Sequence, residues 1–113
     1  MARQLILVRD CAGIRTRIEC EIRPLADGLG LWTMLCAAGL ADGQPSAIKA
    51  QGPFHGPGVA EGLLEAIARS LELQGYTACD QPPIWRLHLQ AELRRIRAEG
   101  CRQLDGFQFS PDQ

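Results

Sequence analysis

The sequence has few aromatic residues, almost no net charge and no long apolar run. Aromatic residues make up 5% of its 113 residues, and its formal net charge is −1 at pH 7. A membrane-spanning helix needs about 20 consecutive apolar residues, and no stretch of the chain comes near that length. Domains that bind nucleic acid are usually strongly basic. We therefore expect no membrane contact and no nucleic-acid partner.

The pattern of cysteines and histidines lacks the signature of a metal site. The five cysteines are odd in number and no two have the short spacing of zinc ligands. Only two histidines, His55 and His88, are present. A small secreted domain would tend toward an even disulfide framework. We expect reduced thiols with no metal and no cofactor, and expect Cys20 and Cys36, inside predicted strands, to be small core residues.

The N-terminus also lacks the pattern of an export signal. Its apolar stretch runs only from Leu5 to Val8, whereas the apolar region of a secretory signal spans about 7–15 residues. This favours a cytoplasmic location. The length fits one domain, for which we expect residues 1–102, followed by a loosely ordered C-terminal tail at 103–113.

The clearest pattern present is an alternation between residues 14 and 23. Even positions carry Ile, Thr or Cys and odd positions carry Arg or Glu. A period of two predicts a strand with one buried face and one face in water, which is typical of antiparallel sheets. Shorter strand patterns at 5–9, 29–38 and 46–51 are separated by turn residues, including Asp42-Gly43. Together they predict a four-stranded antiparallel meander.

The period changes to that of a helix after Pro57. Apolar residues recur every four positions from Val59 to Leu71, which places them on one helix face. Pro57 suits the first helical turn and Gly75 the end of the helix. The sequence thus predicts a first helix directly after the meander.

The segment 83–99 allows two interpretations. Trp85, Leu89 and Leu93 form a helical stripe, but apolar residues at 85, 87 and 89 also alternate, so a strand over 84–89 is an alternative. We favour one helix, closed by Gly100. The predicted fold class is α+β, with a four-stranded antiparallel β-meander followed by two α-helices packed on one face of the sheet. Strand residues such as Ile14 and Ile18 are expected to supply its core.

The stretch 47–61 combines a strand end, a Gly/Pro-rich turn and a helix start. Glycines at this turn permit close backbone approach, and the first N–H groups of a helix can hold an anion. The candidate ligand-binding residues are Gly52, His55, Gly56 and Gly58. A sharp reversal from strand to helix accounts for the same residues without a ligand. Neither a phosphate-loop lysine nor a dinucleotide fingerprint is present.

The same stretch resembles SPOR domains, which bind the glycan strands of peptidoglycan. The matching residues are Gly52-Pro53-Phe54, Ala60-Glu61 and Gly75-Tyr76. The resemblance implies a glycan ligand at this turn. It also implies a helix between the first two strands and an export signal or membrane anchor, whereas this sequence predicts strands throughout its first half.

Two further surfaces are candidates for a protein partner. The first is a basic cluster in the second helix, formed by Arg86, Arg94, Arg95 and Arg97. An ordinary solvated helix face with pairs such as Glu92–Arg95 accounts for it without a partner. The second is the charged face or an edge of the sheet.

The sequence contains no recognisable set of catalytic residues. A nucleophile needs a base within hydrogen-bond reach, and nothing local brings Cys79 to either histidine. We predict a small non-enzymatic interaction or ligand-binding module whose partner is a protein, including a second copy of itself in a homodimer. The alternative function is an anion- or glycan-binding domain that uses the turn at 52–58.

Overall fold

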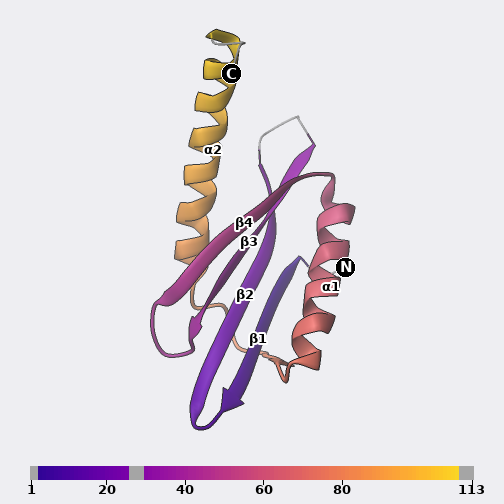
Figure 1. The fold of residues 1–113 in the computed structure, drawn as a ribbon, viewed down its shortest axis with the longest axis vertical. Helices are drawn as coiled ribbons and strands as arrows, with labels where there is room; N and C mark the ends of the chain where they lie inside the picture. Colours follow the sequence, from indigo (N-terminus) through magenta and orange to yellow (C-terminus); the bar gives the residue numbers. More distant parts are fainter. Residues whose placement is uncertain (1–2, 26–29, 110–113) are drawn as a thin grey trace.

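The computed structural model describes residues 3–25 and 30–109, with backbone only from residue 99 onward. Five strands form one antiparallel sheet in the order β4-β3-β2-β1-β5 (Figure 1). The α+β class and the four strands of the meander are confirmed. These strands are β1 (Gln4–Cys11), β2 (Ile14–Pro24), β3 (Leu31–Leu40) and β4 (Pro45–His55).

The sheet has one strand more than the sequence predicted. β5 (Thr77–Ala78) follows the first helix and pairs antiparallel with β1, where Leu7 lies opposite Ala78. Two residues are too few to show an alternation, so the hydropathy pattern carries no signal for this strand. β5 leads the chain from one face of the sheet to the other.

The prediction that both helices pack on one face is wrong. α1 (Pro57–Leu73) covers a core that includes Cys20 and Met34, whereas α2 (Arg86–Phe109) covers a second core that includes Leu35. Neighbouring residues of a strand point to opposite faces, so Met34 and Leu35 belong to different cores. Figure 1 shows the helices on opposite sides of the sheet.

The ambiguous segment is helical from Arg86 onward, so a strand over 84–89 is excluded. α2 continues past Gly100 to Phe109. The loose tail expected at 103–113 stays a prediction, because the backbone of 103–109 continues α2 and residues 110–113 lie outside the described part. No helix among the described residues is both long and apolar enough to cross a bilayer.

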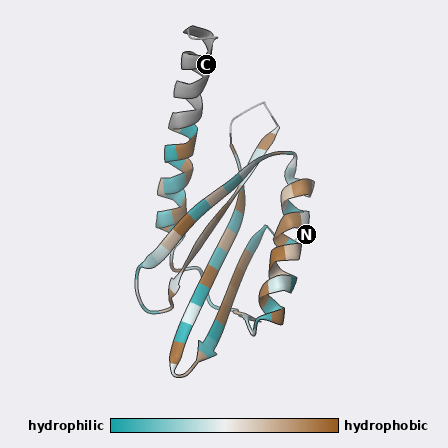
Figure 2. Cartoon of the chain, viewed as in Figure 1, coloured by the Kyte–Doolittle hydropathy of each residue, from teal (hydrophilic) through white to brown (hydrophobic). Residues whose placement is uncertain are grey.

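The alternation in β2 correctly identifies its two faces (Figure 2). Ile22 and Cys20 are buried under α1. Ile14, which we expected in the core, is 55% exposed, because it starts β2 at the hairpin tip and lies outside both core clusters.

The sequence predicted that the charged face of β2 lies in water, but part of this face is buried. Arg17 and Glu19 are 3% and 2% exposed. Glu19 Oε2 accepts hydrogen bonds from Arg17 Nε at 2.6 Å and from the Ile84 N–H at 2.8 Å, and Oε1 accepts one from the Trp85 N–H at 3.1 Å. The connection between β5 and α2 therefore lies over this face and is held there by a carboxylate.

The same connection is fixed at two further points. Arg17 Nη2 donates to the Pro82 carbonyl at 2.9 Å, and the indole Nε1 of Trp85 donates to the Gly43 carbonyl at 3.0 Å. Trp85 itself is 2% exposed and packs with Leu89 and Leu93. The buried charges and the indole thus set where α2 begins.

Replacing Glu19 by glutamine should reduce the free energy of unfolding by about 3–5 kcal/mol, because Arg17 would be left buried without its counter-charge. The matched control is Glu21→Gln. Glu21 lies on the same strand face and pairs with Arg23 at 2.9 Å, but the side chains of Arg23 and Glu21 are 37% and 12% exposed, so the loss there should be smaller, about 1 kcal/mol. Urea denaturation of both variants measures the difference; equal losses would contradict the role given to Glu19.

Candidate functional site

The Gly/Pro-rich turn joins β4 to α1 where the sequence placed it. β4 ends at His55, Gly56 is the N-cap residue of α1 with φ 93°, and Pro57 opens the helix. Gly52 has φ 130°, and a Cβ added there would lie 3.0 Å from the Trp32 carbonyl oxygen. Such backbone angles and such close approach favour glycine, so the chain reversal alone explains these two residues.

The turn offers an open surface to a ligand. His55 and Gly58 are exposed, and the Gly56 N–H donates to the Gly30 carbonyl at 2.9 Å. No side chain caps the N-terminus of α1. The candidate residues Gly52, His55, Gly56 and Gly58 are brought together only as neighbours along one turn, and their ligand stays a prediction.

The arginine cluster of α2 is divided by its contacts. Arg97 donates to the carbonyls of Leu25 and Pro24 at 2.9 and 2.7 Å, which ties α2 to the end of β2. Arg95 forms an ion pair with Glu92 and, through this hydrogen bond, lowers the pKa of that carboxyl.

The other two arginines of the predicted partner-binding set, Arg86 and Arg94, are exposed. All four arginines of the set are exposed, and two of them, Arg95 and Arg97, also have contacts inside the molecule. A partner for these arginines stays a prediction.

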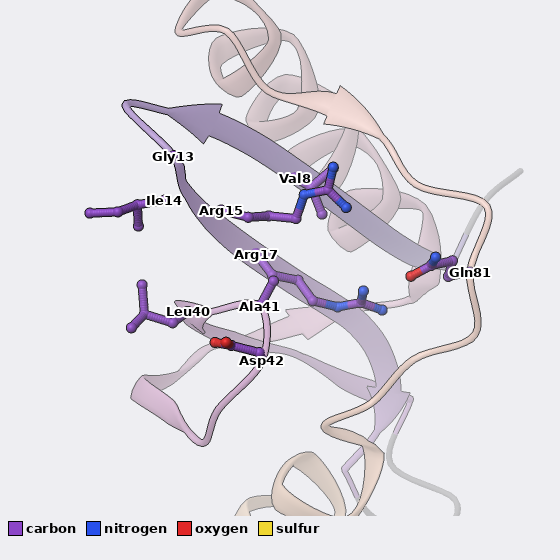
Figure 3. A pocket seen from close by; sticks show the side chains of 9 residues that line it. All are labelled: Val8, Gly13, Ile14, Arg15, Arg17, Leu40, Ala41, Asp42 and Gln81. Atoms are coloured by element: carbon purple, nitrogen blue, oxygen red, sulfur yellow. The ribbon is translucent and has the colours of Figure 1, made fainter.

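A hollow of about 460 Å³, which sequence reasoning missed, lies on the part of the second sheet face that α2 leaves open (Figure 3). Ile14 and Leu40 lie at one end and Gln81 at the other, with Arg15 and Arg17 extending between them. Its size is within the range of small-molecule sites. The lining residues are Val8, Gly13, Ile14, Arg15, Arg17, Leu40, Ala41, Asp42 and Gln81.

The charges around the hollow are largely compensated. Arg15 forms a two-pronged ion pair with Asp10 across the β1–β2 hairpin, at 2.8 and 3.0 Å. The Arg15 hydrogen bonds hold the pKa of Asp10 below its ordinary value. Arg17 is neutralised by Glu19. A hollow whose two cations are both paired in this way gives no electrostatic preference for an anionic ligand.

Among the described strands, β4 has the longest edge without a neighbouring strand. β4 stands at one end of the strand order and pairs only with β3 along its 11 residues. The opposite end is closed by β5, which is two residues long.

Among the described residues, no group of three or more His, Cys, Asp or Glu side chains is arranged to hold a metal ion.

Comparison with known proteins places the chain in a family. The whole chain, residues 1–113, matches the model of the PA4575-like protein family. The chain belongs to this family. No curated protein and no solved structure gives a significant match. The name of this family specifies no reaction, ligand or partner.

The element order of this PA4575-like protein also departs from that implied by the SPOR resemblance. β1 and β2 are joined by the two residues Ala12 and Gly13, with no helix between them. The shared residues around Gly52 are accounted for by the turn from β4 into α1. The glycan ligand that the resemblance implies remains without support from the fold.

Arg15→Gln should raise the pKa of Asp10 back toward its ordinary value, because the variant removes the hydrogen bonds that favour the carboxylate. NMR titration of the Asp10 carboxyl carbon measures this shift. The pair stabilises the folded protein above the unfolded pKa of Asp10, and that contribution is lost as the pH falls through the lower folded pKa. In the control, Arg23→Gln, the Asp10 pKa should stay low; an unchanged value in Arg15→Gln would contradict the pairing.

Proposed function

We propose that this PA4575-like protein is a non-enzymatic interaction module that self-associates through the free edge of β4. The observation that carries the proposal is the position of an 11-residue strand at the end of the sheet. An edge strand presents a row of unpaired N–H and C=O groups that another strand can complete. The missing partner of β4 is a strand of a second copy.

The residues of β4 give this edge little protection. Lys49 is the only charged residue between Pro45 and Pro53. Natural edge strands avoid pairing by several charges, internal prolines, bulges or very short length. Here the prolines and the two irregularities in the register with β3 lie toward the ends of the strand, and the register is regular from Ala47 to Gln51. The central part of β4 is thus suited to pairing.

A second copy suits this edge because the same strand is available in every molecule. Antiparallel pairing about a two-fold axis lets each β4 supply the hydrogen-bond partners of the other, which gives a closed dimer. Backbone hydrogen bonds alone add little net free energy, so apolar contacts are needed. Partly buried apolar residues at the margins of the two cores would supply them, namely Ile48 and Phe54 on β4 and Ile96 on α2.

The wild-type protein should change from monomer to dimer as its concentration rises, and Ala47→Lys/Gln51→Lys should remain monomeric. The two new lysines lie on the same strand face as Lys49, so three like charges would meet their counterparts across the two-fold axis. The matched control is Ala66→Lys/Ser70→Lys, which adds the same charge at exposed positions of α1. This control should dimerise like the wild type.

Sedimentation velocity across the concentration series measures the oligomeric state of all three proteins. A wild type that stays monomeric at high concentration would overturn the proposal. Dimerisation of the β4 variant equal to that of the control would show that copies associate through another surface, such as the hollow or the arginines of α2.

A second candidate function uses the turn at 52–58, favoured by the absence of a side-chain cap at the start of α1. Phosphate should shift the amide resonances of Gly58 and Val59, because the first N–H groups of a helix attract anions. The shifts should weaken as salt rises. A glycan fragment would instead act with little salt dependence. Amides at 56–61 that respond to neither ligand would leave the turn a purely structural element.

A further inference from the structure

Two cysteines far apart in the sequence lie directly opposite each other in the sheet. The antiparallel register of β2 and β3 pairs Cys20 with Cys36. Both belong to the face that α1 covers. Opposed residues in an antiparallel pair point to the same face, with Cα atoms about 4.5 or 5.5 Å apart. A disulfide spans Cα separations of about 4.4–6.8 Å, so the backbone already has the spacing that a bond between these cysteines requires.

The two thiols differ in burial and in proton affinity. Both are free, and Cys20 is 1% exposed, whereas Cys36 lies at the margin of the same core and is only partly buried. A hydrogen bond between the two side chains lowers the pKa of Cys36 and, together with burial, raises that of Cys20. The accessible sulfur is therefore the better nucleophile, and the buried one keeps its proton.

An oxidant from solvent can approach the two cysteines only from the side of Cys36. Lys49 lies opposite Cys36 on the exposed edge strand β4. On the other side, Cys20 packs with Ile22, Met34 and Ala60. A reagent from solvent therefore meets Cys36, the less buried of the two thiols, before Cys20.

We propose that Cys20 and Cys36 form a redox-active dithiol site that low-molecular-weight disulfides oxidise to a cross-strand disulfide. This function is independent of self-association through β4. Cys36 is the attacking residue and Cys20 the resolving residue. The bond would join β2 to β3 in the middle of the sheet.

The exchange balances in two steps. The Cys36 thiolate, its proton released to solvent, attacks one sulfur of the added disulfide; that S–S bond breaks, and the first small thiolate leaves and takes up a proton. Cys20 then loses its proton and attacks the Cys36 sulfur of the mixed disulfide, which expels the second small thiol. Two cysteine thiols are oxidised by two electrons, and one small disulfide is reduced to two thiols.

A variant with Cys11, Cys79 and Cys101 all changed to serine isolates the pair. The folded variant is treated with oxidised glutathione, denatured and alkylated, and its intact mass is measured. We expect loss of both free thiols with no glutathione retained. In the same background, Cys20→Ser should instead accumulate a stable glutathione adduct on Cys36, because the resolving thiol is gone. Cys36→Ser should react at least about tenfold more slowly, because Cys20 is buried.

The proposal is overturned if, after treatment with oxidised glutathione, the triple variant still has two free thiols or keeps glutathione bound to either cysteine. If the triple variant fails to fold, the wild type supplies the same test. Trypsin does not cut between Arg23 and Pro24, so residues 18–49 form one fragment that contains both cysteines. After oxidation this fragment should carry no alkyl group and lack two hydrogens; two alkyl groups on it would contradict the proposal.

Discussion

The structure depends on a carboxylate that lies buried between a sheet and a stretch of irregular chain. Glu19 accepts one hydrogen bond from Arg17 and two from the backbone at Ile84 and Trp85. Removing two charges from water is expensive unless their polar atoms are well satisfied, and here each carboxylate oxygen has a donor. A connection without regular structure has few hydrogen bonds of its own. Glu19 supplies them, and by doing so it fixes the position from which α2 starts.

The placement of α2 decides which surfaces remain open. Because α2 covers the second face over β3 and β4, β3 is buried on both sides and the hollow stays open beside the β1–β2 hairpin. β5 closes the other edge over two residues only. The backbone of β4 is left as the long unpaired edge on which the proposed self-association rests. The paired cysteines lie on the opposite face under α1, so the two proposed activities use different parts of one sheet.

Much of this fold could be predicted from local patterns. The alternation in β2, the Asp42-Gly43 turn and the four-residue period of α1 each depend on neighbours in the sequence. Burial of the charged face of β2 could not be inferred from the sequence. The alternation of apolar and charged residues is the same whether water or another segment of the chain covers the charged side chains. The backbone partners of Glu19 lie 65 and 66 residues away. One available signal was overlooked: the nearly continuous apolar run from Met34 to Ala38 is typical of a strand buried on both faces. The candidate turn was located correctly, but the hollow and the cysteine pair depend on register, which no local pattern specified.

Amide hydrogen exchange at Ile84 and Trp85 tests the central role of Glu19 most directly. Protection from exchange reports how often a given hydrogen bond opens. If the buried carboxylate holds the connection, these two amides should exchange as slowly as the central amides of β2 and β3, and should lose that protection in Glu19→Gln while β2 and β3 keep more of theirs. Rapid exchange at both positions in the wild-type protein would contradict the account, because the Glu19 carboxylate would then not be what holds the connection.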